Sequence, residues 1–163
     1  MEWKNLSKTL PIGSNLLARG LSNLTNCIHC GELEAANHLL LHCEFSRQVW
    51  MQAPFKFSID SSMILDLVTG IKASKTWICA PPTGVSSGHL FPWICWAIWA
   101  ARNHFLFENR VFSPSDTITK AVREAIKWQM AQMTEKPFCQ QDPYRMEEPT
   151  LDSRQIICQT GAA

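Results

Sequence analysis

The pattern of apolar positions in the second half of the chain predicts two helices that pack together. Residues 90–109 are apolar on most faces, which is typical of a buried helix. The next helix is better delimited, because Ser113 can cap it, Pro114 suits its first position and Asp116 completes a capping box. Its apolar stripe consists of Ile118, Val122, Ala125, Ile126, Gln129 and Met133, of which only Gln129 is polar. We expect the two helices to form an antiparallel pair.

The first half of the chain shows shorter and less regular patterns. After turn-like residues at 10–15, the sequence predicts a short helix over 16–21. A longer helical pattern covers 34–51. Residues 63–71 fit a short amphipathic helix that begins at Ser61 or Ser62. The expected structure of this half is therefore a set of short helices.

Composition limits the class of protein. The net charge is +1 and 18% of the residues are charged, so the global field neither strongly attracts nor excludes nucleic acid. Seven cysteines cannot all pair, and no signal-peptide pattern is present, which favours an intracellular protein of the nucleus or cytoplasm over a secreted one. The most apolar stretch, 90–107, contains polar residues and is shorter than the roughly 20 residues that span a bilayer. We expect no membrane partner.

A group of cysteines and a histidine carries the clearest chemical signal. Cys27 and Cys30 form a C-x2-C pair, and His38 and Cys43 follow at compatible spacing. Three sulfurs and one imidazole suit tetrahedral Zn2+. The two-residue gap lets both thiolates face one point, and Gly31 allows the backbone to curl after them. The sequence predicts one zinc site, and the alternative is a set of buried structural cysteines.

Two further histidines compete for the role of nitrogen ligand. His29 lies between the first two cysteines, and His42 lies four residues after His38. However, His42 adjoins Cys43, and adjacent residues of a helix point about 100° apart, so those two could not easily serve one ion. We therefore expect His38 to be the ligand, with one helix over 34–51 carrying both His38 and Cys43.

Several motifs resemble the zinc-binding domain that follows the reverse transcriptase in plant non-LTR retroelements of the LINE type. They are Leu10-Pro11-Ile12-Gly13, Asn15-Leu16, Arg19-Gly20, the CIHCG run at 27–31, His38-Leu39, Cys43 and Val49-Trp50. The resemblance continues downstream. Pro92-Trp93-Ile94, Trp96-Ala97-Ile98-Trp99 and Ala101-Arg102-Asn103 are similar to a helical W-x-I-W-x-x-R-N segment of that family. The resemblance implies a zinc-binding module that helps a reverse transcriptase hold its template.

The end of the chain bears on whether the protein is an enzyme. Residues 157–163 are similar to the first strand of the ribonuclease H domain that often follows in those elements, but Gly161 stands where the family has its first metal-binding Asp. No Tyr-x-Asp-Asp motif of a polymerase is present, and the acidic residues show no pairing typical of general acid and base catalysis. We expect no catalytic residue, no small-molecule substrate and no enzymatic activity.

The expected fold class is mainly α: a small zinc knuckle with short helices, then an antiparallel helix pair and an irregular C-terminal tail. The Pro-, Gly- and Ser-rich loop at 80–88 indicates that the knuckle and the helix pair are separate units. Arg102 and Asn103 interrupt the buried helix, and we expect them to reach solvent or cap a helix end. The predicted regions are 1–53 for the knuckle, 54–89 for a connector with a short helix and the loop, 90–135 for the helix pair, and 136–163 for a linker and the truncated ribonuclease H start.

Nucleic-acid binding has little direct support in the residues. The candidates are Lys4, Lys8, Arg19, Arg47 and Trp50, and four glutamates balance the four basic residues within positions 1–50. Single-strand binders combine a basic groove with stacking aromatic rings, but a tryptophan in the position of Trp50 more often belongs to a core. The partner predicted from the resemblance is RNA or single-stranded DNA. The alternatives are a zinc-stabilised structural or protein-docking fragment, which implies a protein partner, and a remnant without selected function.

Overall fold

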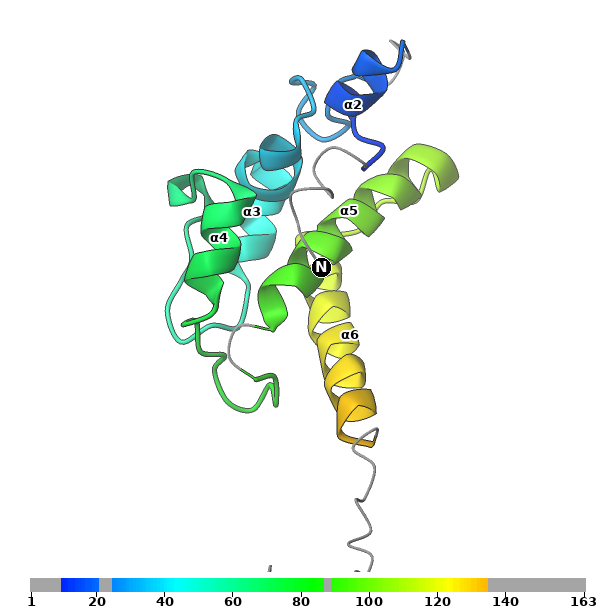
Figure 1. The fold of residues 1–163 in the computed structure, drawn as a ribbon. Coiled ribbons are helices and arrows are strands. Elements are labelled where there is room, and N and C mark those ends of the chain that lie inside the picture. Colours follow the sequence, from blue (N-terminus) through cyan, green and yellow to red (C-terminus); the bar gives the residue numbers. More distant parts are fainter. Residues whose placement is uncertain (1–9, 21–24, 87–88, 135–163) are drawn as a thin grey trace, which may run out of the picture.

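The computed structural model describes residues 10–20, 25–86 and 89–134 and confirms a mainly helical fold (Figure 1). In chain order its elements are helix α2 (Gly13–Ala18), the π-helical turn η2 (His38–His42), α3 (Glu44–Met51), the 3-10 turn η3 (Ser61–Met63), α4 (Leu67–Ser74), α5 (Leu90–Glu108) and α6 (Pro114–Thr134). These described parts contain two isolated bridges and no strand. None of their helices has the length and apolar character needed to cross a membrane. The predicted linker and ribonuclease H start lie outside the described residues.

Helices α5 and α6 form the predicted antiparallel pair. Next to the start of α5, the His89 ring lies 5.8 Å from that of Trp128 late in α6. At the other end, the ring of His104 lies 5.3 Å from that of Phe112, just before α6 begins. Between the two helices the chain reverses at Asn109, which has a φ of 51° and caps α5 in the left-handed conformation.

The predicted capping box starts α6. The backbone N–H of Asp116 donates to Ser113 Oγ at 3.0 Å, and the N–H of Ser113 donates to Asp116 Oδ2 at 3.3 Å. Each side chain thus satisfies a backbone donor that has no partner within the helix. Pro114 occupies the first helical position, where its missing N–H costs nothing.

The expected helix over 63–71 is divided into two pieces. Asp60 accepts from the N–H of Ser62 and caps the turn η3, whereas Asp66 accepts from the N–H of Thr69 at 2.7 Å and caps α4. Two aspartate caps six residues apart therefore start two elements, and α4 begins at Leu67 rather than at a serine.

One continuous core joins the parts of the chain that the loop at 80–88 separates. Helix α5 crosses the middle of the molecule and packs against α6 and α4, while α3 contacts both α5 and α6 (Figure 1). The ring of Trp50 in α3 lies 4.9 Å from that of Phe91 in α5, and Trp77 packs edge-on against both. The region boundaries drawn from the sequence stay a prediction, but the expected independence of knuckle and helix pair is wrong, because both contribute to this core.

Candidate metal centre

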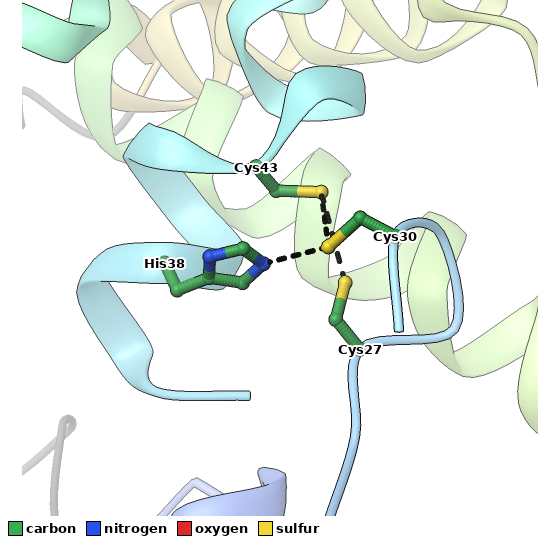
Figure 2. Close-up of side chains that lie close together, drawn as sticks. All are labelled: Cys27, Cys30, His38 and Cys43. Atoms are coloured by element: carbon green, nitrogen blue, oxygen red, sulfur yellow. Dashed lines mark hydrogen bonds between the residues drawn. The ribbon is translucent and has the colours of Figure 1, made fainter. Parts of the chain in front are cut away.

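The four predicted ligands converge on one point. The ligand atoms of Cys27, Cys30, His38 and Cys43 all lie within 4.8 Å of one another, and Figure 2 shows the side chains pointing together. Cys27 Sγ lies 3.6 Å and Cys30 Sγ 3.9 Å from Cys43 Sγ. Zn–S bonds of about 2.3 Å in a tetrahedron place sulfurs about 3.8 Å apart, whereas a disulfide requires about 2.05 Å. The donor set and its spacing therefore fit Zn2+.

A tight turn presents the first two cysteines. The N–H of Gly31 donates to the Cys27 carbonyl at 2.8 Å, and the N–H of Cys27 donates to the Glu32 carbonyl at 2.7 Å. Gly31 has a φ of +80°, a conformation that is costly for residues with a Cβ. This confirms the prediction that glycine lets the backbone curl after the C-x2-C pair.

The last two ligands are not on one α-helix, contrary to expectation. The N–H of Cys43 donates to the His38 carbonyl at 2.7 Å, which closes a π-helical turn, and Cys43 is extended with a ψ of 143° before α3 begins. On an α-helix, residues five apart point about 140° apart at 100° per residue. The wider π turn returns Cys43 to the side of His38. The H-x4-C spacing thus requires the helix over 34–51 to break.

Side chains from other elements stabilise this turn. The three leucines of the turn are buried, and the carbonyl of each accepts a hydrogen bond from a buried side chain. Ser46 Oγ donates to the Leu39 carbonyl, Trp50 Nε1 to the Leu40 carbonyl and Ser61 Oγ to the Leu41 carbonyl. Sequence reasoning missed the two serines, and a run of three leucines gives no sign of which carbonyls need donors. Such pairing matters because an unsatisfied buried carbonyl costs about 1–3 kcal/mol.

Trp50 belongs to the core and not to an aromatic surface. Its side chain has 0% exposure, and its indole N–H is used within the protein. No ring face is available for stacking on a base, so we remove Trp50 from the nucleic-acid candidates in favour of the core interpretation.

His38 presents its Nε2 atom to the cluster. That atom lies 3.1 Å from Cys30 Sγ, while Nδ1 lies 3.4 Å from a carboxylate oxygen of Glu32. A carboxylate on the second ring nitrogen orients a metal-binding imidazole and fixes its tautomer. His42 turns away, because its Nε2 donates to the Ile64 carbonyl at 2.9 Å. The geometry supports His38 over His42 as the nitrogen ligand.

His29 packs instead of binding the metal. Its ring is stacked on Phe45 at 4.2 Å with an interplanar angle of 2°, and it lies 5.7 Å from the ring of Phe105. Burial lowers the pKa of His29 and favours the neutral ring. The residue between the two cysteines therefore packs the knuckle against α3 and α5.

The thiols of the cluster favour a single thiolate when no cation is present. A hydrogen bond from Cys43 lowers the pKa of Cys27 to about 4, and the same bond, together with burial, raises the pKa of Cys43. Desolvation raises the pKa of Cys30. Three thiolates at these distances repel one another, so a divalent cation is needed to hold all three.

Comparison with known families agrees with this geometry. Residues 1–50 match the family model described as zinc-binding in reverse transcriptase, and that range contains all four ligands. Residues 1–50 are a reverse transcriptase zinc-binding domain. No curated protein and no solved structure matches the chain. The match ends at Trp50, so α4, α5 and α6 lie beyond it.

A buried ion pair joins the zinc-binding domain to α5. Glu34 is 0% and Arg102 2% exposed. Arg102 Nη2 donates to Glu34 Oε1 at 2.7 Å, and Arg102 Nε donates to Oε2 at 3.1 Å. The expectation that Arg102 reaches solvent or caps a helix end is wrong, because its guanidinium neutralises a carboxylate that lies 68 positions earlier in the chain. Asn103 Oδ1 accepts a further bond from Arg102 Nη1.

The same carboxylate fixes the start of α2. The N–H of Gly13 donates to Glu34 Oε1 at 2.9 Å, and the N–H of Ser14 donates to the Glu34 carbonyl. A Cβ at position 13 would lie 2.2 Å from the Thr25 carbonyl oxygen and 2.9 Å from Glu34 Cβ. Only glycine fits this approach, which explains the glycine that follows Ile12.

In the part of the zinc-binding domain that the structure describes, the remaining basic candidates give little positive surface. Arg19 is exposed, and Arg47 lies 3.6 Å from the carboxylate of Glu44. Lys4 and Lys8 lie outside the described residues. A zinc ion with three thiolates adds a formal charge of about −1. The local field around the metal centre therefore does not favour phosphate.

Proposed function

We propose that this chain is a non-catalytic module of a reverse transcriptase, in which zinc stabilises a fold that binds RNA or single-stranded DNA. The observation that carries the proposal is the Cys3His group within the segment that matches the family. Four protein ligands complete a tetrahedral ion and leave no position for a reactive water, which is the pattern of structural zinc sites. This supports a role in folding rather than in chemistry.

Zinc stabilises a segment whose described part, residues 25–35, contains no helix and no strand. Between α2 and η2 the described chain contains a tight turn and one isolated bridge, from Asn26 to Leu33. Structural zinc binding is worth about 10–16 kcal/mol in zinc-finger peptides. That amount is comparable with the whole stability of a typical domain, about 5–15 kcal/mol. When bound, the ion therefore decides whether this segment is ordered.

The test is zinc content combined with a salt titration of nucleic-acid binding. Purified protein is analysed by atomic emission, and its binding to labelled single-stranded RNA and DNA is followed by anisotropy at several salt concentrations. We expect one zinc per chain and binding that weakens as salt increases. His38→Ala should lose zinc and binding together, while His42→Ala keeps both.

A second candidate is a zinc-stabilised scaffold that docks a protein. The near-neutral surface of the zinc-binding domain and the continuous core favour it. Stoichiometric zinc without measurable binding of either single strand would support this scaffold and contradict the proposed nucleic-acid function. Less than stoichiometric zinc in the unaltered protein would contradict both.

A further inference from the structure

A cleft lies on the second half of the molecule, outside the segment that matches the family. Its volume is about 550 Å³, and it opens between the end of α5 and the first half of α6. The lining residues are His104, Arg110, Val111, Phe112, Asp116, Thr119, Lys120, Arg123 and Glu124. Polar and charged side chains dominate this lining, which is typical of a site for a charged ligand.

Three cationic side chains and an aromatic ring meet in this cleft. The guanidinium carbon of Arg110 lies 4.9 Å and the ammonium of Lys120 5.8 Å from the centre of the Phe112 ring. Arg123 is exposed one turn further along α6. Within the described parts of the chain, none of the three cations forms an ion pair with a carboxylate. Their charge is therefore free to attract an anion.

The acidic groups of the cleft already have partners. Asp116 accepts from the N–H and hydroxyl of Ser113 in the capping box. Glu124 lies 2.9 Å from the ammonium of Lys127. The third nearby carboxylate, Glu108, contacts His104 at 2.9 Å. The donors of Ser113 are neutral, so Asp116 keeps its negative charge, but Arg110, Lys120 and Arg123 outnumber the carboxylates that no Lys or Arg pairs with.

The clustering of the cations, rather than the net charge, marks this surface. Residues 90–134 contain five Lys or Arg against three Asp or Glu, and because Arg102 neutralises Glu34, four cations remain against three carboxylates. Three of these four line the cleft. A ligand with several negative charges is therefore attracted to the cleft itself.

We propose that this cleft, and not the zinc knuckle, binds the phosphodiester backbone of a single-stranded nucleic acid. The inference rests on the proposed nucleic-acid function and assigns it to a surface. Proteins that bind single strands combine a basic groove with aromatic rings, and in this cleft the cations supply the contacts, because Arg110 and Lys120 lie over the Phe112 ring. Arg110, Lys120 and Arg123 take the phosphates, and Phe112 holds two of these cations in position.

The number of cations sets the expected salt dependence. Each phosphate neutralised on a single strand contributes about −0.7 to the slope of log K against log salt. Three contacts therefore give a slope of about −2. Zinc on the knuckle acts indirectly in this arrangement, through the Glu34 and Arg102 pair that fixes α5.

The experiment compares two triple variants of the full zinc-loaded chain that remove equal charge. The first is Arg110→Gln, Lys120→Gln and Arg123→Gln. The control is Lys56→Gln, Lys72→Gln and Lys75→Gln, at exposed positions on and near α4. Binding of a labelled oligo(U) RNA and an oligo(dT) DNA is measured at several salt concentrations. We expect the cleft variant to bind at least about tenfold more weakly with a slope near zero, and the control to keep most of its slope.

Each outcome has a distinct meaning when circular dichroism and zinc content show that both variants fold. Equal weakening by the two triple variants contradicts the cleft assignment and leaves the proposed function standing. No binding by the unaltered protein overturns both. If poly-glutamate binds the same cations more tightly than either oligonucleotide, the cleft is a protein-docking site and the inference is wrong.

Discussion

Replacing Arg102 with Met tests the link between the zinc-binding domain and the helix pair. The substitution keeps an unbranched, apolar stem of similar length and removes the guanidinium that makes two hydrogen bonds to Glu34. Glu34 is then a carboxylate with 0% exposure that keeps the hydrogen bond from the N–H of Gly13. Breaking a buried pair in this way costs about 3–5 kcal/mol, because one charge remains uncompensated.

This cost is large against the stability of the whole fold. Domains of this size have a free energy of unfolding of about 5–15 kcal/mol, so a loss of about 3–5 kcal/mol in Arg102→Met should remove a fifth of it or more. Urea denaturation with saturating zinc measures the change, and chelator competition measures zinc affinity, which we expect to fall as well. Arg123→Met is the matched control, since Arg123 is exposed and surface substitutions stay within about 0.5 kcal/mol.

A double variant separates the buried charge from lost packing. Arg102→Met combined with Glu34→Gln leaves a neutral amide in place of the carboxylate, so it should be more stable than Arg102→Met alone. Such a rescue is the signature of coupling between two residues in contact. An Arg102→Met protein within 1 kcal/mol of the original, or a double variant less stable than the single one, would refute the assignment of Arg102 as the partner of Glu34.

Three further results are expected. Gly13→Ala should destabilise the protein by about 1–3 kcal/mol in urea denaturation, because the new Cβ meets a backbone carbonyl at 2.2 Å, and wild-type stability would argue against that contact. In chelator competition, His38→Ala should weaken zinc binding strongly and His42→Ala little, and equal losses would contradict the ligand assignment. Zinc affinity should rise with pH through the neutral range, because Cys30 and Cys43 have raised pKa values and must lose protons to bind; a flat profile in a zinc titration would disagree.

The features that the sequence predicts well are local. The C-x2-C pair and its following Gly31 form one turn, so residue type and spacing were enough to find the first two ligands. The capping box at Ser113 and Asp116 is likewise complete within four residues. In both cases the hydrogen bonds that stabilise the element join residues close together in the chain, so the local sequence is enough to predict the element.

The features that the sequence does not predict depend on distant partners. Residues 34–51 have a helical apolar pattern, and the π turn at His38–His42 is stable because Trp50 and Ser61, among others, supply donors to its carbonyls. Arg102 looks like an interruption of an apolar helix until Glu34 is placed beside it. Local sequence patterns do not connect residues as far apart as Glu34 and Arg102, which are separated by 68 positions. Such pairings become visible only in the folded structure.

The metal centre belongs to the body of the fold rather than to an appendage. The turn that carries His38 is bonded to α3 and η3, and Glu34, four residues earlier, is bonded to α5. Because zinc binds only the folded arrangement, its binding free energy stabilises every element that this arrangement requires. The loop at 80–88 separates the two halves in the sequence, but the free energy of zinc binding stabilises both. Zinc on the knuckle therefore supports the helix pair, whose cleft brings Arg110, Lys120 and Arg123 together.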